Sequence, residues 1–189
     1  MKKIKMLVPI LMLAMMFNAG IFMFSTDGNI AEAYGAQLFW VGDLDPPVLL
    51  GWDLVDGGKH LDWGGSTQYS NAWTTGVNAW NQRHNVIRQD TGWTVKDADV
   101  GDWYEESNRI GDVGAGYGAY IRFNRYKMDQ FSDNAKIHAV MHYVGFALGL
   151  GLYDNLPDVM NTTIDPTAPI TCTMGWDIRT FDELYYNVY

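Results

Sequence analysis

The chain has 189 residues, 48% of them hydrophobic and 14% aromatic, with 13 basic and 22 acidic side chains and a formal net charge of −9. This length is typical of a single folded domain, and the acidic balance argues against nucleic-acid binding, because phosphate backbones need clustered Lys and Arg. The only cysteine, Cys172, excludes a disulfide within the chain, so stability must come from packing or from packing plus a bound ion.

Residues 1–33 have the features of a secretory signal peptide. Met1–Lys5 is basic, Met6–Phe17 is almost wholly apolar, and Ala31-Glu32-Ala33 offers a cleavage site of the small-x-small type. The alternative is a membrane anchor, which Pro9 and the cleavage site that follows disfavour. We therefore expect a secreted, extracellular protein that keeps no stable membrane anchor after cleavage.

Residues 34–58 are rich in Gly, Pro and Asp and indicate either a short propeptide or an N-terminal arm packed on the domain. The domain itself is expected over residues 59–189. Its first strand is predicted at Lys59–Trp63, where the side chains alternate, and the two glycines that follow end it.

A helix is predicted over residues 66–82, because large apolar side chains recur there at helical spacing: Tyr69, Trp73, Val77 and Trp80. Two short strands are then predicted at 85–88 and 93–96, around a turn at Asp90-Thr91-Gly92.

An acidic loop is expected next, because five carboxylates follow in a short stretch: Asp97, Asp99, Asp102, Glu105 and Glu106. Calcium prefers such hard oxygen ligands, so it is a candidate cofactor. The spacing matches no defined calcium-binding loop, and a solvated acidic surface is the alternative.

Residues 111–118 are dense in glycine and predict a flexible loop. Tyr120–Asn124 is predicted as an edge strand, in which Tyr120, Arg122 and Asn124 alternate with Ile121 and Phe123.

The next predicted element is an amphipathic helix over residues 133–150, with Ser132 and Asp133 as capping residues and the glycines at 149 and 151 as stops. His138 and His142 are four residues apart, so they lie on the same side of this helix. Trp176, Phe181 and the residues up to Tyr189 predict a short C-terminal helix.

The stretch around His142 resembles the zinc-binding segment of the matrixin branch of the metzincin peptidases. The family motif is His-Glu-x-x-His-x-x-Gly-x-x-His, followed by a turn that carries a methionine. When the first histidine of the motif is placed on His142, Gly149 matches the motif glycine, and Met160 falls where the methionine turn is expected.

The residues that the chemistry needs are replaced in this alignment. Tyr143 occupies the position of the catalytic glutamate, and Phe146 and Leu152 occupy those of the second and third zinc ligands. Catalytic zinc needs three protein ligands and a water molecule whose proton a base accepts. Only His142 would be retained as a ligand, so the resemblance implies a zinc site that this chain no longer completes.

A second alignment places the first ligand on His138, the second on His142 and the motif glycine on Gly145. It leaves Ala139 at the glutamate and Leu148 at the third histidine, with the methionine farther away than the family requires. Neither alignment supplies a glutamate.

The resemblance also implies a fold and a partner. The fold is α+β and metzincin-like (zincin-like): a twisted mixed sheet of four or five strands with an antiparallel edge strand, one backing helix and one central motif helix. In the family, the strand before the zinc helix pairs with an extended peptide, and Tyr120–Asn124 takes that position here. Such strand addition needs only an exposed backbone edge, so it would survive loss of the zinc.

Three functions follow as hypotheses. The preferred one is a secreted matrixin-fold homologue that has lost zinc-dependent peptide hydrolysis and binds a peptide or protein segment. The second is an active zinc metalloendopeptidase with an atypical ligand set, which the missing glutamate disfavours. The third is a secreted carbohydrate-binding protein that uses its eight tryptophans as stacking platforms, which the expected core positions of most tryptophans disfavour.

Overall fold

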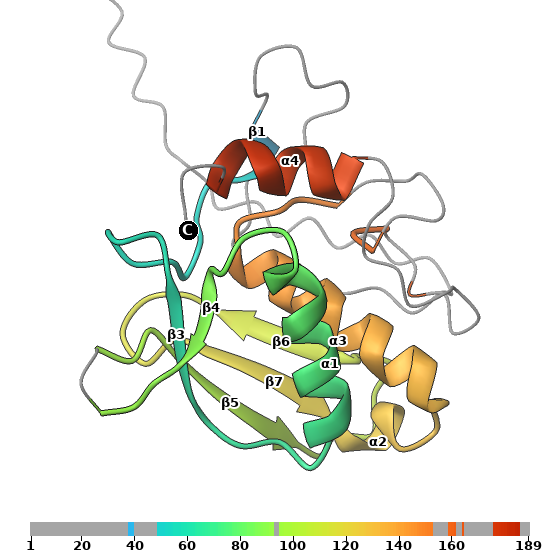
Figure 1. Cartoon of the computed structure of the whole chain (residues 1–189). Coiled ribbons are helices and arrows are strands. Elements are labelled where there is room, and N and C mark those ends of the chain that lie inside the picture. The colour runs from blue at the N-terminus through green and yellow to red at the C-terminus, as the bar shows by residue number, and fades with distance from the viewer. Residues whose placement is uncertain are drawn as a thin grey trace, which may run out of the picture.

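The structure is a computed structural model and describes residues 38–39, 49–92, 95–152, 159–161, 164 and 176–185. Over these residues the chain is α+β, with helices packed against a mixed sheet of five strands (Figure 1). This confirms the predicted α+β class. The predicted signal peptide, residues 1–33, lies outside the described residues. Among the helices that the structure describes, none combines the length and the apolar character that crossing a membrane requires.

The sheet has the strand order β4-β3-β5-β7-β6. Its strands are β3 (Leu61–Gly65), β4 (Ile87–Gln89), β5 (Ala98–Trp103), β6 (Gly111–Gly114) and β7 (Tyr120–Asn124). The pairs β3–β4, β3–β5 and β5–β7 are parallel, whereas β6 runs antiparallel to β7. The sheet therefore has one antiparallel strand at its edge, as predicted.

That edge strand is not the one that the sequence indicated. Tyr120–Asn124 is a strand, but as β7 it pairs with β5 on one side and with β6 on the other. The edge is β6, which lies in the stretch predicted as a flexible loop. Its glycines serve close packing: a Cβ at Gly111 would lie 2.5 Å from the Tyr143 ring, and one at Gly114 would lie 2.5 Å from the Tyr120 ring.

The predicted acidic loop is also corrected, because most of it forms the central strand β5. Ala98 and Val100 are buried, while Asp99 between them is exposed, which is the alternation of a strand with one covered face. The strand predicted at 93–96 is not formed at residues 95–96, and Trp93 and Thr94 lie outside the described residues.

Four helices are described: α1 (Ser70–Asn81), α2 (Arg125–Met128), α3 (Asp133–Ala147) and α4 (Trp176–Tyr185). The α1 and α3 helices cover the same face of the sheet, since Trp73 of α1 and Tyr143 of α3 each have their ring 6.2 Å from that of Phe123 on β7. The predicted backing helix and central helix are therefore both present, and α4 confirms the predicted C-terminal helix.

The end of α3 is held by segments from both ends of the chain. A small antiparallel pair, β1 (Leu38–Phe39) and β2 (Leu49–Leu50), belongs to the segment 34–58. Leu50 N donates to Gly149 O at 2.6 Å and Leu54 N donates to Ala147 O at 2.8 Å. Tyr185 of α4 donates its hydroxyl to Leu148 O at 2.7 Å. These bonds satisfy carbonyls that a helix end leaves without partners, so residues 49–54 pack against the end of α3.

Candidate functional site

The helix α3 starts at a capped residue and is enclosed over most of its length. Ser132 accepts a hydrogen bond from Ala135 N at 3.3 Å, and Asp133 lies in the first turn, where a negative charge is favourable. Every residue from His138 to Leu150 is buried. The sequence predicted one buried face, but the sheet, α1 and the residues around Met160 together cover the helix on all sides.

His142 lies in this buried part of α3 and is held in one orientation. Its Nδ1 donates to Val159 O at 2.7 Å, because a carbonyl can only accept. Burial lowers the pKa of His142 to about 4, an effect that the Val159 bond opposes and that nearby His138 reinforces, so the ring is neutral at neutral pH. Its Nε2 is buried and has no hydrogen-bond partner among the described residues. The neutral imidazole therefore donates from Nδ1 and carries its lone pair on Nε2.

The side chains around His142 are not metal ligands. The Phe146 ring lies edge-on to the imidazole with centroids 4.8 Å apart, and Tyr143 lies 5.4 Å away. Both are fully buried, and Tyr143 packs toward the sheet, against Gly111. Leu152 is partly buried and packs against the core. Because the two positions expected to complete a zinc site carry hydrocarbon side chains, the described residues at this place do not fit a catalytic zinc ion.

The two alignments expected from the sequence place the motif glycine at different points of α3. The helix continues through Gly145, which is not among the glycines with positive φ, and ends before Gly149, where φ is 86°. Such a left-handed residue is the usual way to end a helix. The alignment on His142 has its glycine at this turn, whereas the alignment on His138 has its glycine inside the helix.

Met160 packs directly under α3. A Cβ added at Gly145 would overlap Met160 Sδ and would lie 3.3 Å from Met160 Cε and 3.4 Å from Trp80 Cζ2. Met160 itself is 1% exposed. The methionine thus occupies the space left by the missing side chain of Gly145, and the bond from His142 to Val159 fixes the preceding residue against the same helix.

The acidic residues considered for calcium are dispersed rather than gathered. Asp99 pairs with Lys96 at 2.6 Å, and Asp102 accepts from Gln68 N at 2.7 Å, next to the start of α1. Within the described part of the chain, only Asp97 joins other carboxylates: it lies with Asp56 and Asp62 in a group whose ligand atoms are within 4.8 Å of one another. These three could hold a metal ion, and sequence spacing alone could not show this, because they come from separate segments.

This group of three carboxylates is partly neutralised within the chain. Both oxygens of Asp62 accept from Arg88, each at 2.8 Å, and Asp97 accepts from Asp62 N at 2.7 Å. Burial raises the pKa of Asp97, and the neighbouring carboxylates add to that effect. The geometry identifies neither calcium nor zinc as a ligand.

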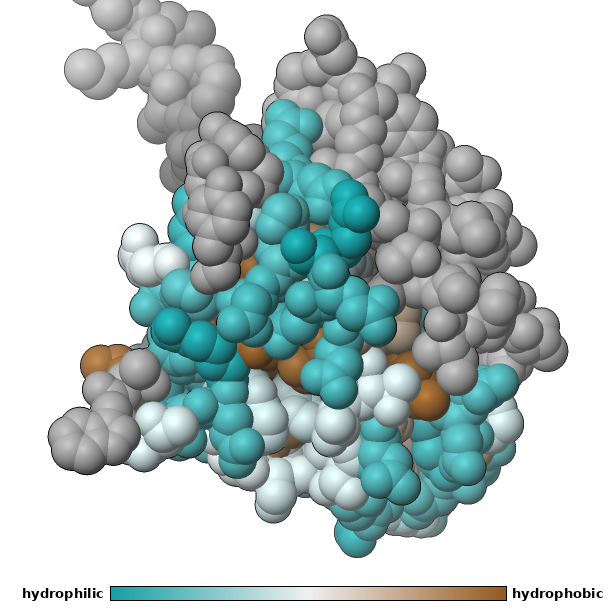
Figure 2. All heavy atoms as spheres, viewed as in Figure 1, coloured by the Kyte–Doolittle hydropathy of each residue, from teal (hydrophilic) through white to brown (hydrophobic). Residues whose placement is uncertain are grey.

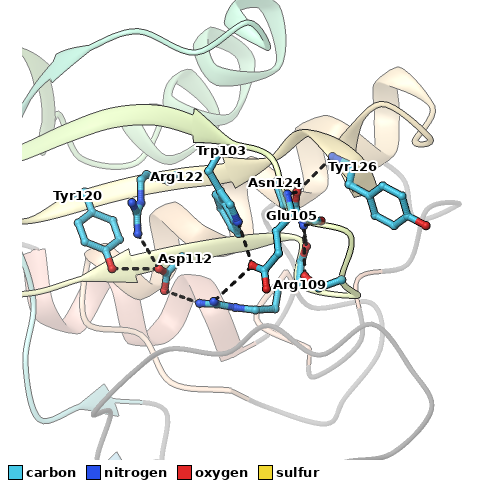
Figure 3. Close-up of polar contacts among 9 residues, drawn as sticks. Trp103, Glu105, Arg109, Asp112, Tyr120, Arg122, Asn124 and Tyr126 are labelled. Atoms are coloured by element: carbon cyan, nitrogen blue, oxygen red, sulfur yellow. Dashed lines mark hydrogen bonds and ion pairs between the residues drawn. The ribbon is translucent and has the colours of Figure 1, made fainter.

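A polar network that the sequence did not predict holds the edge strand β6 in place (Figure 3). Asp112 of β6 accepts from Tyr120 Oη at 2.9 Å and from Arg122 at 3.1 Å, both on β7, and pairs with Arg109 at 3.2 Å. The Asn124 amide bonds to Glu105 O and Arg109 O, each at 2.8 Å, and so organises the connection from β5 to β6.

A scan against models of protein families found none that matches this chain, and a search of curated proteins also found no match.

Proposed function

We propose that this chain is a secreted metzincin-type scaffold of the matrixin branch that has lost zinc-dependent peptide hydrolysis and binds an extended peptide or protein segment along β6. The observation that carries the proposal is the combination at α3. Three features of the scaffold are kept: the left-handed turn at Gly149, the methionine under Gly145, and a buried His142 held in one orientation. The other two ligand positions carry Phe146 and Leu152 instead of histidine. The residue pattern at 1–33 supports the secreted location.

The loss of hydrolysis follows from the residue types. One imidazole cannot replace three zinc ligands, and Tyr143 cannot act as the carboxylate base, a role that is commonly worth about 10²–10⁴-fold in rate. The protein is then expected to bind without cleaving, with the imidazole packed against Phe146 rather than against an ion.

The side of β6 that faces away from β7 provides the binding surface in this proposal. Asn124 N donates to Ile110 O at 2.8 Å, and bonding alternates along an antiparallel pair. The main-chain groups of Asp112 therefore face β7, whereas those of Gly111 and Val113 face the other way. No strand pairs with that side of β6 among the described residues. Gly111 and Val113 are buried, so an added strand would have to displace the groups that cover them before it bonds to their main chains.

The first test measures zinc and proteolysis together. We expect less than stoichiometric zinc after dialysis and no cleavage of casein. Changing Tyr143→Glu, Phe146→His and Leu152→His together should create zinc binding, because it restores the missing donors around His142. Near one equivalent of zinc in the wild-type protein, with proteolysis that a chelator stops, would show instead an active peptidase with a different ligand set. If the triple variant folds without binding zinc while Ala139→Glu with Leu148→His binds it, the alignment on His138 is correct.

The second test measures amide hydrogen exchange in the presence of casein peptides. Bound peptide should slow exchange at Gly111 and Val113 and leave Asp112 unchanged, because Asp112 already bonds to β7. Equal effects at all three residues, or none at saturating peptide, would contradict strand addition at β6.

A further inference from the structure

An open hollow of about 270 Å³ lies between α1 and the strands β3 and β4, and no residue of α3 lines it. The hollow is thus separate from the surroundings of His142. Its lining residues are Trp63, Trp73, Thr74, Val77, Asn78, Asn81, Ile87 and Gln89. Figure 2, in the same view as Figure 1, shows hydrophobic residues lying among hydrophilic ones on this face of the molecule.

Two tryptophans are among the residues that line the hollow, and hydrogen bonds fix its shape. Trp63 of β3 and Trp73 of α1 lie edge to face with centroids 5.1 Å apart. Asn81 at the end of α1 binds both main-chain groups of Ile87: its Nδ2 donates to Ile87 O at 2.7 Å, and its Oδ1 accepts from Ile87 N at 2.9 Å. The helix and the edge strand β4 are therefore tied together beside the hollow.

The polar groups of the hollow are all uncharged. Thr74, Asn78 and Gln89 are exposed and offer one hydroxyl and two amides, which can both donate and accept. Trp73 is 3% exposed, and its Nε1 donor is buried without an acceptor among the described residues. Because this donor is buried, a ligand in the hollow would bond to the exposed hydroxyl and amides instead.

We propose that this hollow binds a neutral saccharide, with one sugar ring against Trp63 and its hydroxyls on Asn78 and Gln89. A pyranose has an apolar face of C–H groups and a rim of hydroxyls, which matches an aromatic wall beside neutral amides. The volume is slightly below the roughly 300–1,000 Å³ of pockets for drug-sized ligands, so it suits one ring rather than a chain of several. A charged ligand would find no counter-charge among the lining residues, and an anion would also meet the net charge of −9.

The test is a titration of the isotope-labelled protein with a panel of neutral sugars: glucose, galactose, mannose, N-acetylglucosamine and their short oligomers. The indole N–H resonances of Trp63 and Trp73 report on the hollow, and p-cresol serves as a non-sugar probe. We expect at least one sugar to shift these resonances in a saturable way at millimolar concentration.

Variants assign the effect to the hollow. Asn78→Ala combined with Gln89→Ala should weaken sugar binding by about tenfold or more, because two hydrogen bonds are lost. Asn71→Ala is the matched control, since Asn71 is exposed on the same helix two turns away and does not line the hollow. The proposal is overturned if no sugar gives a saturable shift, if the double variant binds as tightly as the control, or if only p-cresol binds. The last result would indicate an aromatic side chain of a protein partner.

Discussion

Substituting Gly145→Ala tests the contact between α3 and Met160, which supports the function proposed above. Gly145 lies inside α3, where alanine is normally more favourable than glycine by about 0.8–1.0 kcal/mol. Here the new methyl group would overlap Met160 Sδ and approach Trp80. Both neighbours are about 1% exposed, so neither can swing into solvent to make room.

The two effects have opposite signs, and the structure decides which is larger. Overpacking a dense core costs about 1–3 kcal/mol, which exceeds the gain in helix propensity. We therefore expect Gly145→Ala to lower the free energy of unfolding by about 1 kcal/mol. In a Met160→Ala background the obstacle is gone, so the same substitution should raise the free energy of unfolding by about 1 kcal/mol. The coupling between the two sites is then about 2 kcal/mol.

The assay is urea unfolding of the four proteins in the double-mutant cycle, followed by far-UV circular dichroism, with the slope m compared across the set to check two-state behaviour. Met160→Ala alone should lower stability by about 2–5 kcal/mol, so the cycle is measured at a temperature where this variant remains folded. If Gly145→Ala changes stability by the same amount in both backgrounds, to within about 0.5 kcal/mol, Met160 does not pack under Gly145 and the reasoning fails.

Two further predictions concern the core around His142. Phe146→Ala should lower the free energy of unfolding by about 3–5 kcal/mol, because the fully buried ring packs on His142 and Tyr143. Leu152→Ala should lower it by only about 1–2 kcal/mol, since the Leu152 side chain is partly exposed. Urea unfolding measures both variants, and equal losses of stability would contradict the difference in burial. Stability should also fall as the pH drops from 6.5 toward about 4, because in that range the unfolded chain protonates His142 and the folded chain does not. The loss of stability attributable to His142 is at most about 3 kcal/mol. The measurement is the free energy of unfolding of wild type and His142→Gln across this pH range. The same pH dependence in both proteins would contradict the interpretation.

The parts of the fold that the sequence predicted are those encoded by local patterns. The spacing of Trp73, Val77 and Trp80 predicted a helix at 66–82, and α1 forms at Ser70–Asn81. The stretch 133–150 likewise contains α3, with its left-handed glycine at 149. Helical periodicity and capping depend on residues within a few positions of one another, so they can be read without knowing the rest of the chain.

The errors lie where distant segments decide the structure. Glycine and acidic content predicted loops at the positions of β6 and β5, but both are strands, because Tyr143 and Tyr120 require small neighbours and because Ala98 and Val100 face the helices. Strand order depends on which backbones meet across the sheet, and no local pattern records that choice.

By itself, the sequence determined the residue types next to His142, because residue types are read directly: Tyr143, Phe146 and Leu152 carry neither a carboxylate nor an imidazole. Only the tertiary structure decided the rest. It made β6 the edge strand, brought Asp56, Asp62 and Asp97 together, and formed the hollow between Trp63 and Asn78. These features join segments far apart in the chain, and their positions follow from the packing of helices on the sheet and from long-range hydrogen bonds rather than from neighbouring residues.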